Sequence, residues 1–548
     1  MGVVERNVRR RIDYNGAVIK MILLNDVHIP LSADFSDLKP VAAKELKTKI
    51  NNIKNASLYR KSVDARKKTD VHFCCSLAVN LYSGEEKAVK RCRKAKLFEE
   101  KRYEFIRARF KPLNRPVVVG FGPAGMFAAL TLSRAGLRPI VIERGADVDK
   151  RSLDVEKFLS GGPLDPESNV QFGEGGAGTF SDGKLNTGIK DPRCREILSL
   201  FVAFGAPENI LTDAKPHIGT DILKTAVKNL RKEIENCGGE IRFGSKLQDI
   251  NISNGAVKSV TVNDEEIKTD SVFLAIGHSA RDTFKMLKSK GIFMIRKPFA
   301  MGVRIEHLQS DINRALYGEF ADDPALCAAD YKLSAHLDNN RSVYTFCMCP
   351  GGEVINASSE NKGIAVNGMS YSKRDGVNAN SALLVGISPD DLEGDDPLEG
   401  CILQRSIEQK AYAFKNGSVP ITTVGNLVYS KEQKLGKIKP TVRPDFAFCD
   451  IRKILPDFIT DSIAQAIKIF ARKIEGFDCD DAVITLPETR SSSPVRIVRD
   501  ENGESTSARG LYPCGEGAGY AGGIMSAAAD GMRQAEAYIN FKNRFIAE

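Results

Sequence analysis

The most regular hydrophobic pattern in the chain lies within residues 117–144. Three consecutive valines, Val117–Val119, predict a short buried strand of the kind found in parallel sheets. A helix-like run over residues 126–135 mixes large apolar residues with small ones and ends at Gly136. A second apolar run, Ile140–Ile142, follows and closes on an acidic residue. The pattern therefore predicts a strand–helix–strand unit with both strands buried.

The turn between this strand and helix carries glycines at a spacing suited to phosphate binding. Gly120, Gly122 and Gly125 follow the pattern G-x-G-x-x-G. The first permits a sharp turn, the second lets a pyrophosphate approach the backbone, and the third lets helix and strand pack closely. The helix N-terminus adds N–H groups and a partial positive charge. Glu143, at the end of the second strand, can accept hydrogen bonds from ribose hydroxyls, so the context predicts a dinucleotide site.

Further apolar runs continue the α/β pattern. They predict a helix over 224–236, a strand over 240–247, a β-meander over 250–269, a strand over 272–277, a strand within 511–523 and a helix over 524–540. This order resembles the layout of FAD-binding domains of the glutathione-reductase type.

Residues 297–504 follow a different pattern. Strand-like runs at 300–306, 342–348, 363–369 and 382–387, with helices near 397–415 and 461–474, predict a mixed or antiparallel sheet covered by two helices. The N-terminal part predicts a small α+β domain, with a strand at 17–31, a helix at 38–50, two strands within 57–82 and a helix with a linker at 90–110.

Composition limits the class of protein. The 548 residues suggest roughly three domains, and 42% hydrophobic with 27% charged residues is typical of a soluble globular protein. No apolar run approaches the ~18 residues of a membrane span, and residues 1–20 lack the apolar core of a secretory signal. We therefore expect a cytoplasmic protein without a membrane partner. The net charge of +9 belongs to residues 1–115, which hold 27 Lys/Arg and 13 Asp/Glu, a net of +14. That charge could bind nucleic acid or an acidic electron carrier, or form a solvated surface.

The cysteines and histidines show no metal-type spacing. The twelve cysteines include no C-x-x-C pair and the six histidines no H-x-x-x-H, so we expect reduced thiols and no metal. Cys347 and Cys349 lie two apart on a predicted strand, so their side chains are expected to point the same way as core thiols. Of the neighbours Cys74 and Cys75, at least one should be in the core, and Cys514 is expected to be a packing residue.

Two groups of polar residues are candidate catalytic groups. His278 and Arg281 follow a strand that ends at Gly277, so they would face the mouth of a cofactor site, where a histidine could move protons. Arg490, with Arg496 and Arg499, could hold an anionic substrate, or belong to a surface loop.

The chain resembles a family of uncharacterised FAD-dependent dehydrogenases or oxidoreductases over nearly its whole length. The motifs that carry the resemblance are Gly120-x-Gly-Pro-Ala-Gly125, Glu143-Arg-Gly145, the loop 171–184 (QFGEGGAGTFSDGK), 215–221 (KPHIGTD), 275–282 (AIGHSARD), 297–299 (KPF), 347–352 (CMCPGG) and 514–519 (CGEGAG). Relatives usually carry Gly-Asp where this chain has Gly515-Glu516, which changes that contact by about one methylene.

The resemblance implies an α/β fold. It consists of a Rossmann-like three-layer (ββα) FAD-binding domain at 111–285 plus 505–548, a substrate or cap domain at 286–504, and a basic N-terminal α+β domain with its linker at 1–110. From the turns and the resemblance together, the expected FAD contacts are Gly120, Gly122, Pro123, Ala124, Gly125, Glu143, Arg144, Gly175, Gly176, Thr179, Ser181, Asp182, Gly183, Leu247, Ala275, Gly277, Gly515, Glu516, Gly522, Gly523 and Ile524.

The expected function is a flavoprotein oxidoreductase, a dehydrogenase or reductase that moves a hydride between flavin N5 and a small molecule. Only one strand–glycine–helix unit is present, so NAD(P)H would act only as a transient donor. Two alternatives stay open: an NAD(P)H-dependent flavin monooxygenase, and an FAD-bound RNA-binding or RNA-modifying protein that uses its basic N-terminal domain.

Overall fold

The computed structural model describes residues 19–100 and 103–544, which divide into two compact units. One unit contains residues up to 104 together with 184–218 and 313–329, and the other contains 105–183, 219–312 and 330 onwards. Residues 184–218, predicted in the FAD-binding domain, and 313–329, predicted in the cap, group here with the N-terminal strands. The three-domain boundaries themselves stay a prediction. Among the described residues, no helix has both the length and the hydrophobicity of a membrane span.

The larger unit is built on a five-stranded parallel sheet. Its order is β23 (Leu511–Pro513), β11 (Val272–Leu274), β5 (Val117–Val119), β6 (Ile140–Ile142) and β7 (Glu240–Arg242). Val117 is aligned with Ile140 on one side and Val272 on the other, and Val272 with Leu511. The chain therefore leaves this sheet after β11 and returns near its C-terminus to add the edge strand, as predicted.

The two faces of this sheet carry different layers. Val117, Val119 and Val272 pack in one core with the meander β8 (Leu247–Ser253), β9 (Ala256–Val262) and β10 (Glu265–Lys268). The alternate residues face α4 (Pro123–Arg134), α7 (Thr220–Asn236) and α13 (Ile524–Arg544), as the 5.6 Å ring contact between Phe273 and Tyr538 shows. The predicted three-layer ββα arrangement is confirmed.

The strand predicted over residues 240–247 is shorter in the structure. The run 240–247 was expected to be one strand, but β7 ends at Arg242 and Leu247 begins β8. Gly244, with a φ of +60°, turns the chain between them. The side chain of Leu247 therefore lies in the core between sheet and meander, so its predicted contact with FAD does not come from that side chain.

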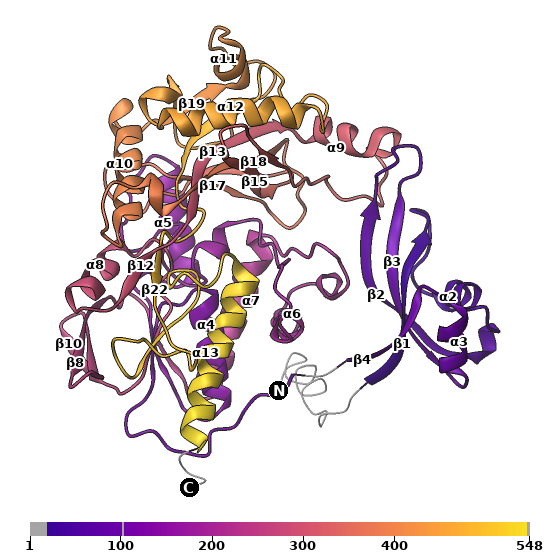
Figure 1. Cartoon of the computed structure of the whole chain (residues 1–548), viewed down its shortest axis with the longest axis horizontal. Helices are drawn as coiled ribbons and strands as arrows, with labels where there is room; N and C mark the ends of the chain where they lie inside the picture. The colour runs from indigo at the N-terminus through magenta and orange to yellow at the C-terminus, as the bar shows by residue number, and fades with distance from the viewer. Residues whose placement is uncertain (1–18, 101–102, 545–548) are drawn as a thin grey trace. The chain divides into compact units, whose positions relative to one another are not determined.

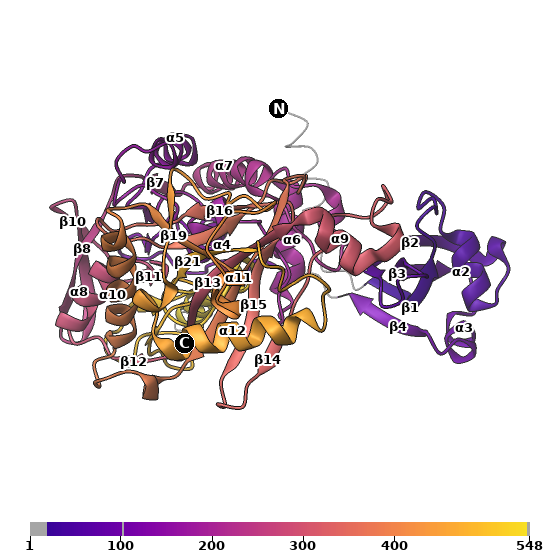
Figure 2. The same ribbon diagram turned by 90° about the horizontal axis from the view of Figure 1, so that it is seen from above.

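A seven-stranded mixed sheet forms the second half of this unit. Its order is β14 (Ser334–His336), β15 (Ser342–Cys349), β18 (Asn378–Ile387), β13 (Phe299–Leu308), β21 (Val483–Glu488), β19 (Val419–Thr423) and β20 (Phe446–Phe448), with only the last pair parallel. The predicted helices are α10 (Glu399–Phe414) and α12 (Asp457–Ala471), and two views place α12 along β13 and β15 (Figures 1 and 2).

Smaller elements complete the unit. They are the helices α5 (Val148–Leu159), α8 (Arg281–Ser289) and α11 (Val424–Tyr429), and the strand pairs β12 (Met294–Arg296) with β22 (Val495–Ile497) and β16 (Glu353–Asn356) with β17 (Val366–Met369). A further helix, α9 (Gln309–Tyr317), begins in this unit, and its residues from Asn313 onwards belong to the smaller unit.

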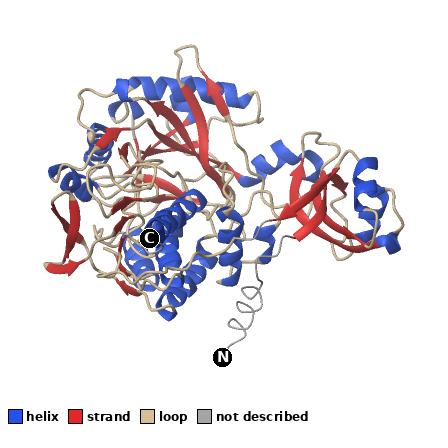
Figure 3. Cartoon of the chain, turned by 60° about the horizontal axis from the view of Figure 1, so that its bottom comes forward, coloured by secondary structure: helices blue, strands red, loops and turns tan. Residues whose placement is uncertain are grey.

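The smaller unit contains an antiparallel sheet of order β2 (Ile53–Asp64), β3 (His72–Leu81), β1 (Ile19–Ile29) and β4 (Ala95–Glu100), with helices α2 (Lys39–Leu46), α3 (Glu85–Arg91) and α6 (Arg193–Ala203). Figure 3 shows short helices along one side of this sheet. Residues of α2 and α3 share a core with alternate strand residues, among them Cys75, which confirms that one of the two adjacent thiols is buried.

The predicted helix at 90–110 is wrong. α3 ends at Arg91, and β4 follows, aligned antiparallel with β1 from Leu24 opposite Ala95 to Ile19 opposite Glu100. Pairing with the edge of β1 satisfies the backbone of this charged segment, so the strand is favoured although its sequence lacks strong alternation.

Candidate functional site

Glycines from three distant parts of the chain meet in the larger unit. A Cβ built on Gly176 would lie 2.9 Å from the Cα of Gly122. A Cβ on Gly515 would lie 2.6 Å from the Cβ of Ala124. A Cβ on Gly178 would lie 3.0 Å from the side chain of Ile524, the first residue of α13. The first turn of α4, the loop 171–184 (the glycine-rich loop) and the start of α13 therefore converge, as expected from the sequence.

The turn before α4 has the geometry that its glycines predict. Gly120 has a φ of +92°, and a Cβ there would lie 2.4 Å from the carbonyl oxygen of Ala275. A Cβ on Gly125 would lie 1.9 Å from the carbonyl oxygen of Gly120. Gly122 caps α4 without a side-chain hydrogen bond and Pro123 occupies its first turn, so the N-terminal N–H groups of the helix are left for a ligand.

Glu143 ties three backbone segments together. Its Oε2 accepts from Phe121 N at 2.7 Å, and its Oε1 accepts from the N atoms of Gly145 and Gly173, both at 2.9 Å. A carboxylate offers about four lone-pair sites, so one is left to accept a ribose hydroxyl. Its neighbour Arg144 is engaged with protein carboxylates, at 2.6 Å from Glu167 and 2.9 Å from Asp282.

A buried arginine that the sequence analysis missed holds the glycine-rich loop. Arg151, on α5, is fully buried, and its guanidinium donates to five backbone carbonyls, those of Asn169, Val170, Gly173, Glu174 and Gly176, at 2.7–3.3 Å. Burial lowers the pKa of Arg151 to about 10, so it keeps its charge at neutral pH. The partners of Arg151 are backbone carbonyls, which every residue type has. The amino-acid sequence therefore contains no pattern that predicts these hydrogen bonds.

The polar side chains of this loop are turned toward protein atoms. Thr179 donates to the carbonyl of Glu174, and Ser181 donates to that of Gly178 while accepting from Gly183 N. Asp182 is buried and forms an ion pair with Arg374. These contacts fix the loop, whose backbone at Gly176 lies next to α4, and the expected contacts of these side chains with the cofactor stay a prediction.

A histidine and a glutamate meet where β11 and β23 end. A Cβ on Gly517 would lie 2.3 Å from the carbonyl oxygen of Gly277, so the two strand ends touch. His278 Nδ1 lies 3.3 Å from Glu516 Oε1. His278 Nε2 is buried and has no hydrogen-bond partner among the described residues. This nitrogen is a polar atom that a ligand can satisfy.

Two cations lie beside this pair. Burial lowers the pKa of Lys297, the charge of Arg496 lowers it further, and the charge of Glu516 opposes both. Arg496 lies against the ring of Tyr520 at 5.1 Å, and its buried Nε lacks a partner within the described chain. Nearby, a Cβ on Gly522 or Gly523 would meet no described atom within 4 Å, so the start of α13 has open space beside it.

Arg281, predicted to face the cofactor mouth, and two of the three arginines predicted to hold an anionic substrate are paired with protein carboxylates. Arg281 donates to Glu408 at 2.9 and 3.0 Å, and Arg490 donates to the same carboxylate at 2.8 and 3.0 Å. All three residues are buried. Arg499 similarly pairs with Asp530 at 2.7 Å. Since these guanidiniums already balance protein carboxylates, we assign them a structural role; of the three predicted anion-binding arginines, Arg496 has an unpartnered donor.

The Cys347–Cys349 prediction is also corrected. The register of β15 shifts between Phe346 and Cys349, and Cys347 has a φ of +40°. This bulge separates the two thiols, leaving Cys347 exposed and Cys349 buried. Cys514 is fully buried, and burial raises its pKa, in keeping with the predicted packing role.

The residues present fit an extended dinucleotide with a redox-active ring. Glycine backbone and helix N–H groups lie together at Gly122 and Gly176, Glu143 keeps acceptor capacity, and the unpartnered His278 Nε2 lies at the ends of β11 and β23. These features are what FAD requires at its pyrophosphate, ribose and flavin regions.

Comparison with known proteins agrees with this fit. Residues 298–491 match the family described as FAD-dependent protein, C-terminal domain-like, and residues 21–80 match a domain of unknown function, DUF8436. An uncharacterized protein of Clostridium beijerinckii is 46% identical over 94% of this chain and 98% of that protein.

Solved structures give weaker similarities. A geranylgeranyl bacteriochlorophyll reductase-like protein of Thermoplasma acidophilum is 13% identical, with a TM-score of 0.36 over 79% of this chain and 78% of that one. Glycine oxidase of Bacillus cereus is 11% identical, with a TM-score of 0.35 over 78% of this chain and 98% of that one. At TM-scores this low, the likeness supports no inference about activity. The domain match and the Clostridium relative together show that the chain belongs to an uncharacterised family of FAD-dependent proteins.

Proposed function

We propose that this protein is an FAD-dependent oxidoreductase that exchanges a hydride with a small molecule bearing an anionic group. The observation that carries the proposal is the buried, unpartnered Nε2 of His278 at the place where the glycine elements converge. FAD, when bound, supplies the hydride acceptor and donor at N5 of its flavin.

The binding roles follow from the backbone. The N-terminus of α4, with Gly122 and Gly176 in contact, would bind the pyrophosphate through N–H groups and the helix dipole. Glu143 would accept from a ribose hydroxyl with its remaining lone pair. Arg151 would act as a positioning residue, because it holds the loop that carries Gly176.

His278 and Glu516 supply the proton chemistry. The carboxylate of Glu516, 3.3 Å from Nδ1, favours a proton on that nitrogen and leaves the lone pair of Nε2 for the substrate. A substrate that loses a hydride from carbon also loses a proton from its oxygen or nitrogen, and Nε2 would accept that proton. In the reverse direction the same atom would return it.

Lys297 and Arg496 would hold the anionic group. Lys297 lies close to both Arg496 and Glu516, and burial together with repulsion from Arg496 lowers the pKa of Lys297. An anion bound between them would relieve this repulsion and satisfy the buried Nε of Arg496. A small carboxylic acid has the required charge, and so has a nicotinamide nucleotide that binds transiently as donor.

Anaerobic reduction of the purified protein tests the proposal. The flavin absorbance should bleach with one member of a panel of hydroxy acids, amino acids, NADH and NADPH, and the same compound should support turnover. Bleaching by NADPH alone, followed by substrate-stimulated oxidation in air, would instead indicate the monooxygenase. A protein that stays colourless after reconstitution with FAD would contradict both.

A further inference from the structure

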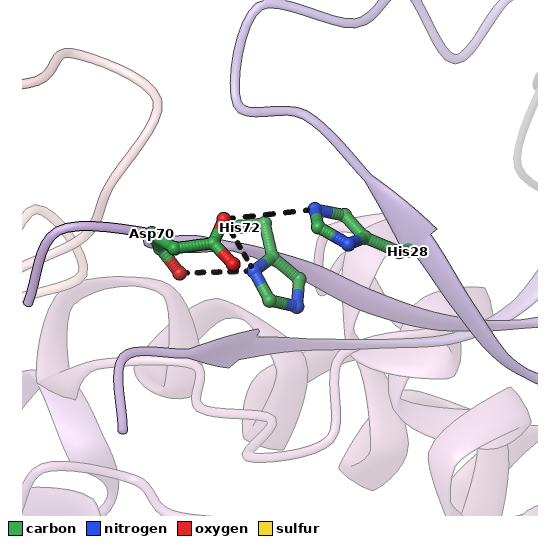
Figure 4. A group of neighbouring side chains, drawn as sticks. All are labelled: His28, Asp70 and His72. Atoms are coloured by element: carbon green, nitrogen blue, oxygen red, sulfur yellow. Dashed lines mark hydrogen bonds and ion pairs between the residues drawn. The ribbon is translucent and has the colours of Figure 1, made fainter. Parts of the chain in front are cut away.

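The sheet of the smaller unit brings two histidines and an aspartate together (Figure 4). His28 lies on β1 opposite Cys74 of β3, and His72 lies two residues before Cys74 on β3. Side chains alternate along a strand, and Phe73 and Cys75 face the core with α2 and α3. His28 and His72 therefore share the opposite face, where Asp70 joins them from the turn before β3.

The three side chains direct nitrogen and oxygen atoms that could bind a metal ion toward a common space. His72 Nδ1 lies 3.4 Å from Asp70 Oδ1, and His28 Nε2 lies 4.0 Å from the same oxygen. One ligand atom from each residue lies within 4.8 Å of the other two. The imidazole rings are stacked, with centroids 3.5 Å apart and planes inclined by 21°.

These separations are close to those of a tetrahedral metal site. Ligand atoms at the usual zinc distances of ~2.0–2.1 Å lie about 3.3 Å from one another. The His72–Asp70 pair already has this spacing, and His28 Nε2, 4.0 Å from Asp70 Oδ1, needs to move inward. Side chains of His28 and Asp70 are 53% and 55% exposed, so this movement needs only a change of side-chain torsions.

We propose that His28, Asp70 and His72 bind a divalent cation of the zinc class, with a fourth position open to water. Two imidazoles and one carboxylate form a donor set that suits zinc and its neighbours in the transition series. Ion pairing alone gives little reason for these three side chains to lie together, because exposed ion pairs contribute little to the stability of the fold.

Binding would change the tautomer of His72. Without the metal, Nδ1 lies 3.0 Å from the backbone carbonyl oxygen of Asp70, and a proton on Nδ1 closes that hydrogen bond. The metal requires the lone pair of Nδ1, so the proton moves to Nε2 and this local bond is released. The cation then links β1 to the turn before β3.

The site lies wholly within residues 21–80, the part that matches a domain of unknown function. It depends on residues of the smaller unit alone, so it is independent of the flavin chemistry proposed above. Its open position faces solvent, where a water or an anionic group of another molecule could complete the coordination.

Metal content of the full-length, FAD-loaded protein tests the proposal. After dialysis against Zn²⁺ and removal of excess ion, the wild type should retain one zinc per chain, measured by mass spectrometry, and unfold at a higher temperature than the metal-free protein. His28→Ala and His72→Ala should each lower zinc affinity at least tenfold, and Asp70→Asn should lower it less. His336→Ala removes an exposed histidine outside the cluster and should retain the zinc.

Circular dichroism and flavin absorbance of the variants show whether they fold. Equal zinc content in the wild type, His28→Ala and His72→Ala would overturn the proposal, and so would a wild type that retains no zinc. In the Co²⁺-substituted protein, a thiolate-to-metal band that disappears in Cys74→Ser would also overturn it, because the donor set would then include sulfur.

Discussion

Gly176 and Gly122 touch backbone to backbone: a Cβ on the first would lie 2.9 Å from the Cα of the second. Gly176 also has a φ of +62°, a conformation that side chains other than glycine rarely adopt. The contact joins the glycine-rich loop to the first turn of α4, so the proposed pyrophosphate site depends on the absence of side chains at two positions.

We expect Gly176→Ala to weaken FAD binding at least tenfold. The methyl group meets backbone at Gly122, and the left-handed conformation costs a non-glycine residue about 1–2 kcal/mol. The FAD content after purification and the dissociation constant from flavin fluorescence measure the effect. Gly188→Ala is the control, because a Cβ there meets nothing within 4 Å; equal loss in both variants would contradict the role given to Gly176.

Arg151→Ala should lower both the free energy of unfolding and the affinity for FAD. The change removes one donor from five buried carbonyls. Those of Gly173, Glu174 and Gly176 keep another donor, whereas those of Asn169 and Val170 have no other donor among the described residues, and each such group costs about 1–3 kcal/mol. We expect a loss of at least about 3 kcal/mol in chemical denaturation, with reduced FAD occupancy. Lys150→Ala, an exposed neighbour on the same helix, should change neither quantity.

Much of the fold could be predicted because each element carries a local signal. Val117–Val119, the glycine turn and the meander each have a pattern that specifies their conformation independently of the rest. Partners such as Arg151 or Glu408 carry no such signal, because their contacts come from residues far apart in sequence. The cluster of His28 with His72 depends on strand register, so the expectation of no metal, drawn from spacing along the chain, did not test it.

The ion pairs that Glu408 forms with Arg281 and Arg490 predict how the free energy of unfolding depends on pH in the acid range. Burial alone would raise the pKa of Glu408, but the guanidiniums of Arg490 and Arg281 outweigh it and hold that pKa well below its usual value. A folded-state pKa below the unfolded value of 4.5 means that this carboxylate stabilises the fold fully above about pH 4.5. The contribution is lost as the pH falls from there toward the folded-state pKa.

We therefore expect Glu408→Gln to be destabilised by about 3–5 kcal/mol at pH 7, because two buried guanidiniums lose their partner. The difference from the wild type should narrow as the pH falls below 4.5, as urea unfolding at several pH values can show. Glu393→Gln, at an exposed glutamate, should follow the wild type throughout. A constant difference across this range would contradict the assignment.

The proposed proton acceptor predicts a change in turnover without a change in cofactor content. His278→Gln keeps a polar side chain but cannot transfer a proton, so kcat should fall about 10²–10⁴-fold while FAD stays bound. The pH dependence of kcat should also flatten. Unchanged kcat in a fully loaded variant would exclude His278 from the chemistry.

Lys297→Met should act on substrate binding instead. Removing one of the two cations beside Glu516 should raise KM at least tenfold for an anionic substrate, with a smaller change in kcat. Lys332→Met, at an exposed lysine, is the matched control. If KM is unchanged, the anionic group is held elsewhere.

The position of β23 has a consequence for biosynthesis. Within the described residues, Leu511–Pro513 form the last strand, yet they pair with β11, made more than two hundred residues earlier, and the backbone of Ala124 lies against Gly531 of α13. While the ribosome is still translating, β11 therefore keeps an open edge and α4 lacks its neighbour. A nascent chain that stalls before Leu511 would therefore carry the entire seven-stranded sheet but would lack the strand and helix that complete the proposed cofactor pocket.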